Sequence, residues 1–306
     1  MPFQGRIFSK SSIPLLAFAA LCLIGGTTWA LQKTGLNNSL PLWSAGMRFL
    51  IAGAIIFLFQ FLRRQFQLNT NVIKLALANG LFYFAVPFGT VYWASSHVPS
   101  GLVAVLASSI SVYALLLNHF LRGKPASFRQ ILGVLCAVIG IIIVFSNRLH
   151  IESNSIGILA MVSILFAMGS SAAITLKVQR RISELPFLNF VSLSMLCGGA
   201  LLLSASLILE SGVRTFSSTS LYALLYLAII GSVLGFSLNI LLLKNWHISK
   251  ATSHLFISPV IALYIGYVFM DEIITTNVGI GTSIVILGVM LINFPPFKKG
   301  LKDVKC

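Results

Sequence analysis

The chain has 306 residues, of which 57% are hydrophobic and only 9% are charged. A water-soluble domain with this balance could not cover its surface with polar groups, so lipid is the expected solvent for most of the chain. The formal net charge of +15 would suggest a nucleic-acid partner in a soluble protein. Here the basic residues lie between apolar runs, so orientation in a membrane explains them better and no nucleic acid is expected.

Ten apolar runs follow one another along the chain, each close to the roughly 20 residues that cross the hydrocarbon core of a bilayer. Helices are the form expected, because lipid offers the backbone no hydrogen-bond partners and each segment must pair its own groups. The runs cover residues 13–31, 42–62, 75–93, 102–121, 130–146, 156–176, 187–209, 221–243, 251–270 and 278–294. The predicted fold class is therefore an all-α integral membrane protein of ten transmembrane helices.

Prolines mark the starts of some runs and interrupt others. Pro14, Pro41 and Pro186 stand at run starts, where a missing N–H costs nothing. Pro87 and Pro259 fall inside the third and ninth runs, which we expect to kink or unwind locally there. The first run lacks a clear signal-peptidase site and is interpreted as an uncleaved helix.

The cysteines point to neither a disulfide framework nor a metal site. They stand at positions 22, 136, 197 and 306 without paired spacing, and three of them lie inside apolar runs. We interpret them as small hydrophobic residues and expect no metal and no cofactor.

The distribution of basic residues predicts the orientation. Seventeen Lys and Arg residues lie before the first run, in every second connection and after the last run, against three in the opposite connections. By the positive-inside rule both termini are cytoplasmic, with tails at residues 1–12 and 295–306, and the expected location is the cell membrane, most simply a bacterial inner membrane.

The two halves of the chain resemble each other. Gly133 and Gly140 recur with the same spacing as Gly281 and Gly288, 148 residues later. These glycines, and the Gly231-xxx-Gly235 pattern, are interpreted as close-packing faces within the fold or between subunits, without a chemical role.

Each half would hold five helices, in residues 13–146 and 156–294. Because five is odd, the second copy must enter the membrane upside down. Inverted repeats of this kind place a solute site between the halves near mid-membrane and alternate its exposure by rocking.

The chain resembles the ten-helix carriers of the drug/metabolite transporter superfamily, which are built from two EamA-type domains. The features that carry the resemblance extend over most of the chain and are Trp29, Lys33, Pro41, Arg48-Phe49-Leu50, Ser100-Gly101-Leu102-Val103-Ala104, Pro259, Glu272, Gly281 and Gly288. Ser111 and Lys124 depart from it, since the family often has proline and an acidic residue there. The resemblance implies transport, mostly export of amino acids, other metabolites or drugs, with nucleotide sugars or sugar phosphates in some relatives.

Arg48 is the one formally charged residue inside a run and the first candidate for solute binding. A charge in this position is costly unless it faces a cavity or a partner, and a guanidinium can hold a carboxylate in bidentate fashion. The alternatives are a packing hydrogen bond to backbone carbonyls, or extension to the outer interface near Asp271 and Glu272.

Aromatic and hydroxyl side chains supply the remaining candidates, because an organic solute needs an apolar wall with a few hydrogen-bonding groups. We expect Trp29, Tyr83, Tyr113, Ser237 and Ser258 to contact the solute. Trp and Tyr near helix ends also serve as interfacial anchors, and small polar residues also serve helix packing, so a structural role is the alternative for each.

His254 is the candidate for proton coupling, with a hydrogen-bonded packing role as its alternative. Glu272 closes the ninth run at the outer surface, where a helix-end or gate contact is the expected role. Asn79 and Asn118 are further polar groups inside the runs.

The sequence favours a secondary transporter, most simply an exporter of small metabolites, over the other function classes. The paired groups of intramembrane enzymes and the phosphate loop of a pump are absent from the sequence, so no enzyme and no ATP-binding subunit is expected. An importer or exchanger of the nucleotide-sugar or sugar-phosphate type, a channel and a non-transporting assembly protein remain alternatives. The expected partners are a small solute and the lipid bilayer, with a homo-oligomer possible.

Overall fold

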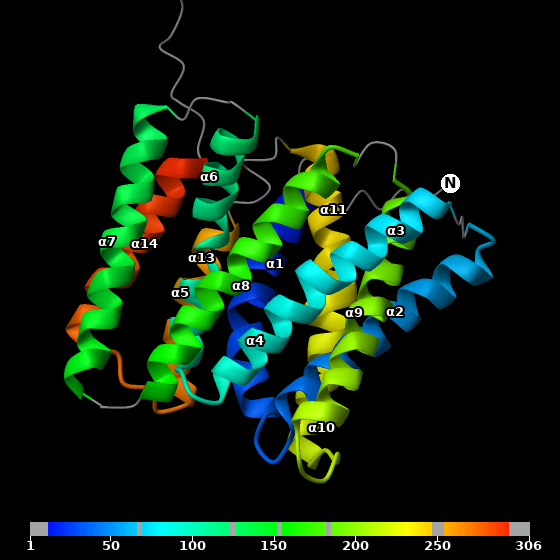
Figure 1. Ribbon diagram of the computed structural model, residues 1–306, viewed down its shortest axis with the longest axis horizontal. Helices are drawn as coiled ribbons and strands as arrows, with labels where there is room; N and C mark the ends of the chain where they lie inside the picture. The colour runs from blue at the N-terminus through cyan, green and yellow to red at the C-terminus, as the bar shows by residue number, and fades with distance from the viewer. Residues whose placement is uncertain are drawn as a thin grey trace, which may run out of the picture.

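The computed structural model describes residues 12–65, 69–122, 127–151, 155–181, 185–246 and 254–293, and these parts of the chain contain helices and no strand (Figure 1). The first half of the chain contains α1 (Ser12–Gly35), α2 (Pro41–Leu62), α3 (Thr70–Asn79), the π-helix η1 (Gly80–Ala85), α4 (Val86–Ser95), α5 (Ser100–Ala107), α6 (Ile110–Arg122) and α7 (Phe128–Ile151). The second half contains α8 (Ser155–Gln179), α9 (Phe187–Leu209), α10 (Ser218–Tyr226), the π-helix η2 (Leu227–Leu234), α11 (Gly235–Asn245), α13 (His254–Phe269) and α14 (Thr276–Asn293).

Most of the predicted runs correspond to helices long enough to cross a membrane. Within the described residues seven helical segments have the required length and apolar composition, and three shorter apolar helices cover Phe128–Val144, Ile257–Phe269 and Thr276–Ile292. The protein is therefore a multi-pass membrane protein. The start of the predicted ninth run, residues 251–253, lies outside the described residues.

Polar side chains extend two helices beyond their apolar runs. The helix of the third run, α3, begins at Thr70 because Asn69 Oδ1 accepts a hydrogen bond from the N–H of Asn71. The helix of the eighth run, α10, begins at Ser218 because Ser217 Oγ accepts a hydrogen bond from the N–H of Ser220.

Three runs contain an irregularity at a place that hydropathy does not reveal, and in the eighth run it is the π-helix η2. In the third run the π-helical segment η1 directly precedes α4, whose second residue, Pro87, has a ring that would clash with the carbonyl of Tyr83 in a regular α-helix. The fourth run is broken at Ser108 and Ser109, between α5 and α6. By contrast, α13 continues through Pro259.

Helices of one half pack mainly against helices of the other. Figure 1 shows α7 beside α14 at one edge of the bundle and α2 beside α9 at the other, in agreement with their contacts, and α1 packs against α13. The larger hydrophobic core lies among α2, the third membrane segment and α9, and a second core lies between α5 and α8.

The repeated glycines form the contact between α7 and α14. A Cβ on Gly133 would lie 2.7 Å from the carbonyl oxygen of Gly288, and a Cβ on Gly140 would lie 2.6 Å from that of Gly281. Because no side chain fits at these distances, the glycines allow the two backbones to touch. Of the two predicted roles, packing within the fold is the one the structure shows.

Candidate functional site

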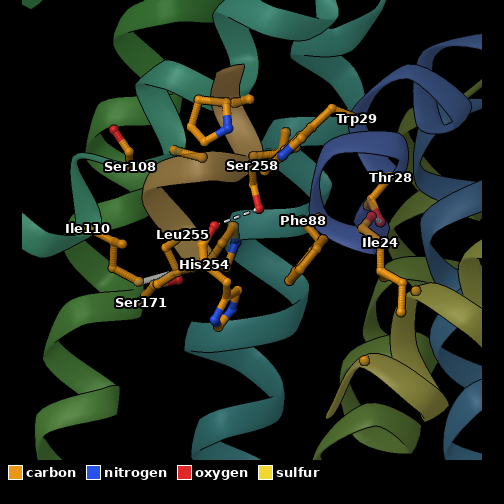
Figure 2. A pocket seen from close by; sticks show the side chains of 18 of the residues that line it. Ile24, Thr28, Trp29, Phe88, Ser108, Ile110, Ser171, His254, Leu255 and Ser258 are labelled. Atoms are coloured by element: carbon orange, nitrogen blue, oxygen red, sulfur yellow. Dashed lines mark hydrogen bonds between the residues drawn. The ribbon is translucent and has the colours of Figure 1, made fainter. Parts of the chain in front are cut away.

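A cavity of about 340 Å³ is lined by residues from both halves of the chain. In Figure 2, Ile24 and Thr28 of α1 lie on one side of it, and Ser108, Ile110 and Ser171 lie on the opposite side. Its walls are mostly apolar and aromatic with a few polar groups, which is the usual composition of a site for a small organic molecule. The break between α5 and α6 contributes Ala107, Ser108 and Ile110 to the lining.

Five of the predicted site residues line this cavity together, namely Trp29, Arg48, Tyr83, His254 and Ser258. The structure thus brings residues from α1, α2, η1 and α13 to one space. This arrangement permits simultaneous contact with one solute, which stays a prediction.

Arg48 is buried, with 3% of its surface exposed, and its guanidinium contacts hydroxyl groups and aromatic rings. Its Nε donates to Ser232 Oγ at 3.0 Å and its Nη1 donates to Tyr92 Oη at 3.3 Å. The guanidinium carbon lies 5.2 Å from the centre of the Phe49 ring and 5.5 Å from that of Phe88, within cation–π range. Among the described residues no carboxylate pairs with it.

The π-helix η2 positions the hydroxyl that orients Arg48. Ser232 Oγ donates its proton to the carbonyl of Leu227, five residues earlier, at 3.0 Å. With its proton committed, the oxygen presents its lone pairs to Arg48 Nε. These contacts are made with hydroxyl oxygens of other membrane segments and not with backbone carbonyls or with the outer acidic residues. Solute binding by Arg48 and a packing role for it both stay predictions.

His254 and Ser258 lie one turn apart at the start of α13. Ser258 Oγ donates to the carbonyl of His254 at 3.0 Å, as the dashed line in Figure 2 shows. His254 is 8% exposed and is one of the residues that line the cavity. Proton coupling through it stays a prediction.

Tyr113 and Ser237 lie outside the lining of this cavity, unlike Tyr83 and Ser258. The ring of Tyr113 packs against α8, with two of its carbons 3.6 Å from where a Cβ of Gly169 would lie. Ser237 is exposed on the bundle surface, where its hydroxyl donates to the carbonyl of Val233 at 2.7 Å. The structure therefore does not bring these two residues to the space shared by the other five.

Gly231 and Gly235 both line the cavity. A Cβ at either position would meet a side chain of α1, Thr28 or Ile24, at 3.4–3.8 Å, so the backbones do not touch there as they do between α7 and α14. Their spacing indicates that the two glycines lie on one face of the helix. That face, which includes part of the π-helix η2, borders the cavity.

Gln32 lines the cavity, and neither it nor its hydrogen-bond partner Ser95 was singled out from the sequence. Gln32 is 1% exposed and its Nε2 donates to Ser95 Oγ at 2.8 Å, while Ser95 Oγ donates to the carbonyl of Val91 at 2.8 Å. The signal available was the spacing of Thr28 and Gln32 by one turn on α1.

An ion pair and its hydrogen bonds connect the ends of α1 and α13 with the start of α5, on the side of the bundle at the bottom of Figure 1. Lys33 Nζ donates to Glu272 Oε1 at 2.8 Å, and the N–H and hydroxyl of Ser100 donate to the same carboxylate at 2.8 and 3.0 Å. The carboxylate occupies the space left by the missing side chain of Gly266. The expected helix-end contact of Glu272 is thus observed, and it joins both halves of the chain.

The protonation of Glu272 should make stability pH-dependent. Burial raises the pKa of this carboxyl, but the hydrogen bonds and charge of Lys33 and the hydrogen bonds of Ser100 outweigh burial and hold the pKa below its usual 4.5. A pKa that is lower in the folded state means that the carboxylate stabilises the fold above pH 4.5, and that this contribution is lost as the pH falls below that value. We expect the melting temperature of the purified protein to fall more steeply on acidification than that of Glu272→Gln. Parallel curves for the two proteins would contradict the assignment.

Comparison with known proteins decides the family. The model of the EamA-like transporter family matches twice, over residues 12–146 and 155–294. The chain belongs to the EamA-like transporter family. This membership places it among transporters and not among enzymes.

This EamA protein matches curated relatives that are named as transporters, and the matches extend over nearly their whole length. The chain is 28% identical over 302 residues to "Uncharacterized inner membrane transporter YedA" of Escherichia coli K12, covering 96% of this chain and 95% of that protein. It is 25% identical over 288 residues to "Uncharacterized transporter YoaV" of Bacillus subtilis, covering 92% and 96%. A solved structure titled "Crystal structure of protein" matches with a TM-score of 0.66 at 17% identity, over 93% of this chain and 99% of that chain, and supports the fold.

Proposed function

We propose that this EamA protein is a secondary carrier that moves a small organic solute with an anionic group by alternating access around the cavity. The observation that carries the proposal is Arg48, a buried guanidinium that lines the cavity and has no carboxylate partner among the described residues. A buried cation is costly without a compensating negative group, so a solute anion would supply what the protein does not.

Several observations support a build of ten transmembrane helices in two inverted repeats, 13–146 and 156–294. The seven long helical segments and the three shorter ones together account for the ten predicted runs. Each half has a π-helix in the middle of its third membrane segment, η1 and η2. Such segments are rare and concentrate at functional sites, so their matched placement favours a duplicated architecture.

Export is the proposed direction of transport. In this proposal the protein lies in a bacterial inner membrane with both termini in the cytoplasm, and the Lys33–Glu272 pair lies on the outer side. The pair and its bonds to Ser100 hold that side together in this conformation. A solute would then load from the cytoplasmic side, as an exporter of small metabolites, such as amino acids or drug-like organic solutes, requires.

The size of the cavity favours small metabolites over nucleotide sugars. Its volume of about 340 Å³ is near the lower end of the range for small-molecule sites. A channel is the other alternative, and two matched halves around a shared cavity favour a carrier.

The proposal predicts saturable flux with counterflow. The purified protein would first be screened by thermal shift against carboxylate metabolites and their uncharged amides, because a ligand of the folded state raises the melting temperature. The best stabilising carboxylate, loaded unlabelled into proteoliposomes, should drive transient accumulation of the labelled compound above equilibrium. Flux that rises linearly with concentration without counterflow would indicate a pore. Equal stabilisation by the amides would contradict anion recognition.

A further inference from the structure

The space beside Gly231 touches two polar side chains of the cavity. A Cβ placed on Gly231 would lie 3.4 Å from Arg48 Nη2 and 3.4 Å from Thr28 Oγ1. All three residues line the cavity, and they come from η2, α2 and α1. Because glycine has no side chain, the space between the guanidinium and the hydroxyl is left open.

The hydrogen bonds of Arg48 direct its remaining donors toward this space. Nε is committed to Ser232 and Nη1 makes a bond to Tyr92, whereas Nη2 donates to no group in the described parts of the chain. A solute anion therefore meets the Nη2 end of the guanidinium, since the Nε edge is already occupied.

Thr28 has the opposite hydrogen-bonding character. Its hydroxyl proton is donated to the carbonyl of Ile24 at 2.6 Å, so its oxygen offers only lone pairs to a ligand. The space beside Gly231 is thus bounded by a positively charged donor and a neutral acceptor.

We propose that this space, the Gly231 subsite bounded by Arg48 Nη2 and Thr28 Oγ1, binds the polar end of the solute. An anionic oxygen accepts from Nη2, and an O–H or N–H group on a neighbouring atom of the same solute donates to Thr28. Gly231 is then a specificity-determining residue because its missing side chain admits this end of the solute. This subsite rests on the proposed anion recognition by Arg48.

Gly235, one turn further along, provides a matched control. A Cβ there would lie 3.6 Å from the carbonyl oxygen of Ile230 and 3.8 Å from Ile24 Cγ2, so it meets no side chain with a donor or a charge. Both glycines line the cavity, and a methyl group at either position is in ordinary contact with its neighbours. Substitutions at the two sites should therefore be tolerated equally by the fold.

Charged thiol reagents test the subsite without knowledge of the solute. In full-length protein with the four native cysteines replaced, Gly231→Cys and Gly235→Cys would each be reacted with anionic 2-sulfonatoethyl and cationic 2-trimethylammonioethyl methanethiosulfonate. The ratio of the two rates cancels differences in thiol reactivity and reports the local charge. We expect the anionic-to-cationic rate ratio to be roughly tenfold higher at position 231 than at 235. Adding Arg48→Gln should abolish the difference.

Equal rate ratios at the two positions would overturn the subsite, while leaving anion recognition to be judged from solute binding by the Arg48 variants. Gly231→Ala gives an independent measurement if the cysteine variant does not fold. It should lose counterflow of the carboxylate identified by thermal shift, at unchanged folded yield, while Gly279→Ala, which lies outside the cavity lining, keeps it. Counterflow retained in Gly231→Ala would also overturn the subsite.

Discussion

Arg48→Ala is expected to reduce transport of the carboxylate solute strongly while leaving most of the folded protein intact. Hydrogen bonds to a charged group contribute about 1.5–3 kcal/mol, so the apparent affinity should fall roughly tenfold to a hundredfold. Ser232 keeps its bond to the carbonyl of Leu227 after the substitution, so the loss does not leave that hydroxyl unpaired. Counterflow and the thermal shift induced by the solute would both be measured.

Two further variants separate binding from packing. Arg48→Lys should restore little activity, because a single ammonium cannot bond to Ser232 and Tyr92 and still present a free planar edge. Arg181→Ala removes an exposed arginine and should change neither measurement. If Arg48→Ala instead yields little folded protein while Arg48→Gln folds and transports normally, the guanidinium has only a packing role.

Gly288→Ala is expected to produce the largest loss of stability among single-methyl changes at the α7–α14 contact. The added carbon would lie 2.6 Å from the backbone nitrogen of Ala137, and it would also clash with the carbonyl oxygen of Gly133. Backbone atoms of a packed helix cannot move aside alone, so the helices must separate. Overpacking of this kind costs about 1–3 kcal/mol.

Gly279→Ala in the same helix is the control for this substitution. Apart from the adjacent backbone of its own helix, no atom of the described residues lies within 4 Å of its added Cβ, so the melting temperature should match the wild type or rise slightly because alanine favours helix. Melting of the two variants in the same detergent would be compared. Equal melting temperatures would show that the α7–α14 contact does not limit stability.

The long apolar segments were predictable because each must pair its own backbone groups in lipid. The seventh run, 187–209, coincides with α9, Phe187–Leu209. Arg48 was recognisable as a candidate because a charge inside an apolar run is unusual whatever the fold.

The faces of the helices were less predictable, because small irregularities change which way later residues point. The π-helix η2 alters the helical phase before Ser237, and that side chain lies on the exposed surface. The break at Ser108 and Ser109 similarly precedes Tyr113. Both interruptions consist of residues that suit an apolar helix, so hydropathy gives no sign of them. The contact between Lys33 and Glu272 joins residues 239 positions apart and depends on the tertiary fold.

The separation of Arg48 from Ser232 has a consequence for biogenesis. The two partners are 184 residues apart, and a ribosome adding roughly 5–20 residues per second needs on the order of ten to forty seconds to make the intervening chain. During that interval the α2 segment has a guanidinium in or near the bilayer, and its partner in η2 has not yet been synthesised. Gln60 of α2 likewise lacks its hydrogen-bond partner Asn189 until that residue has been synthesised. The first half is therefore expected to remain near the insertion machinery, or at the water interface, until the second half is made. A chain truncated after the first half should be a substrate for membrane proteolysis.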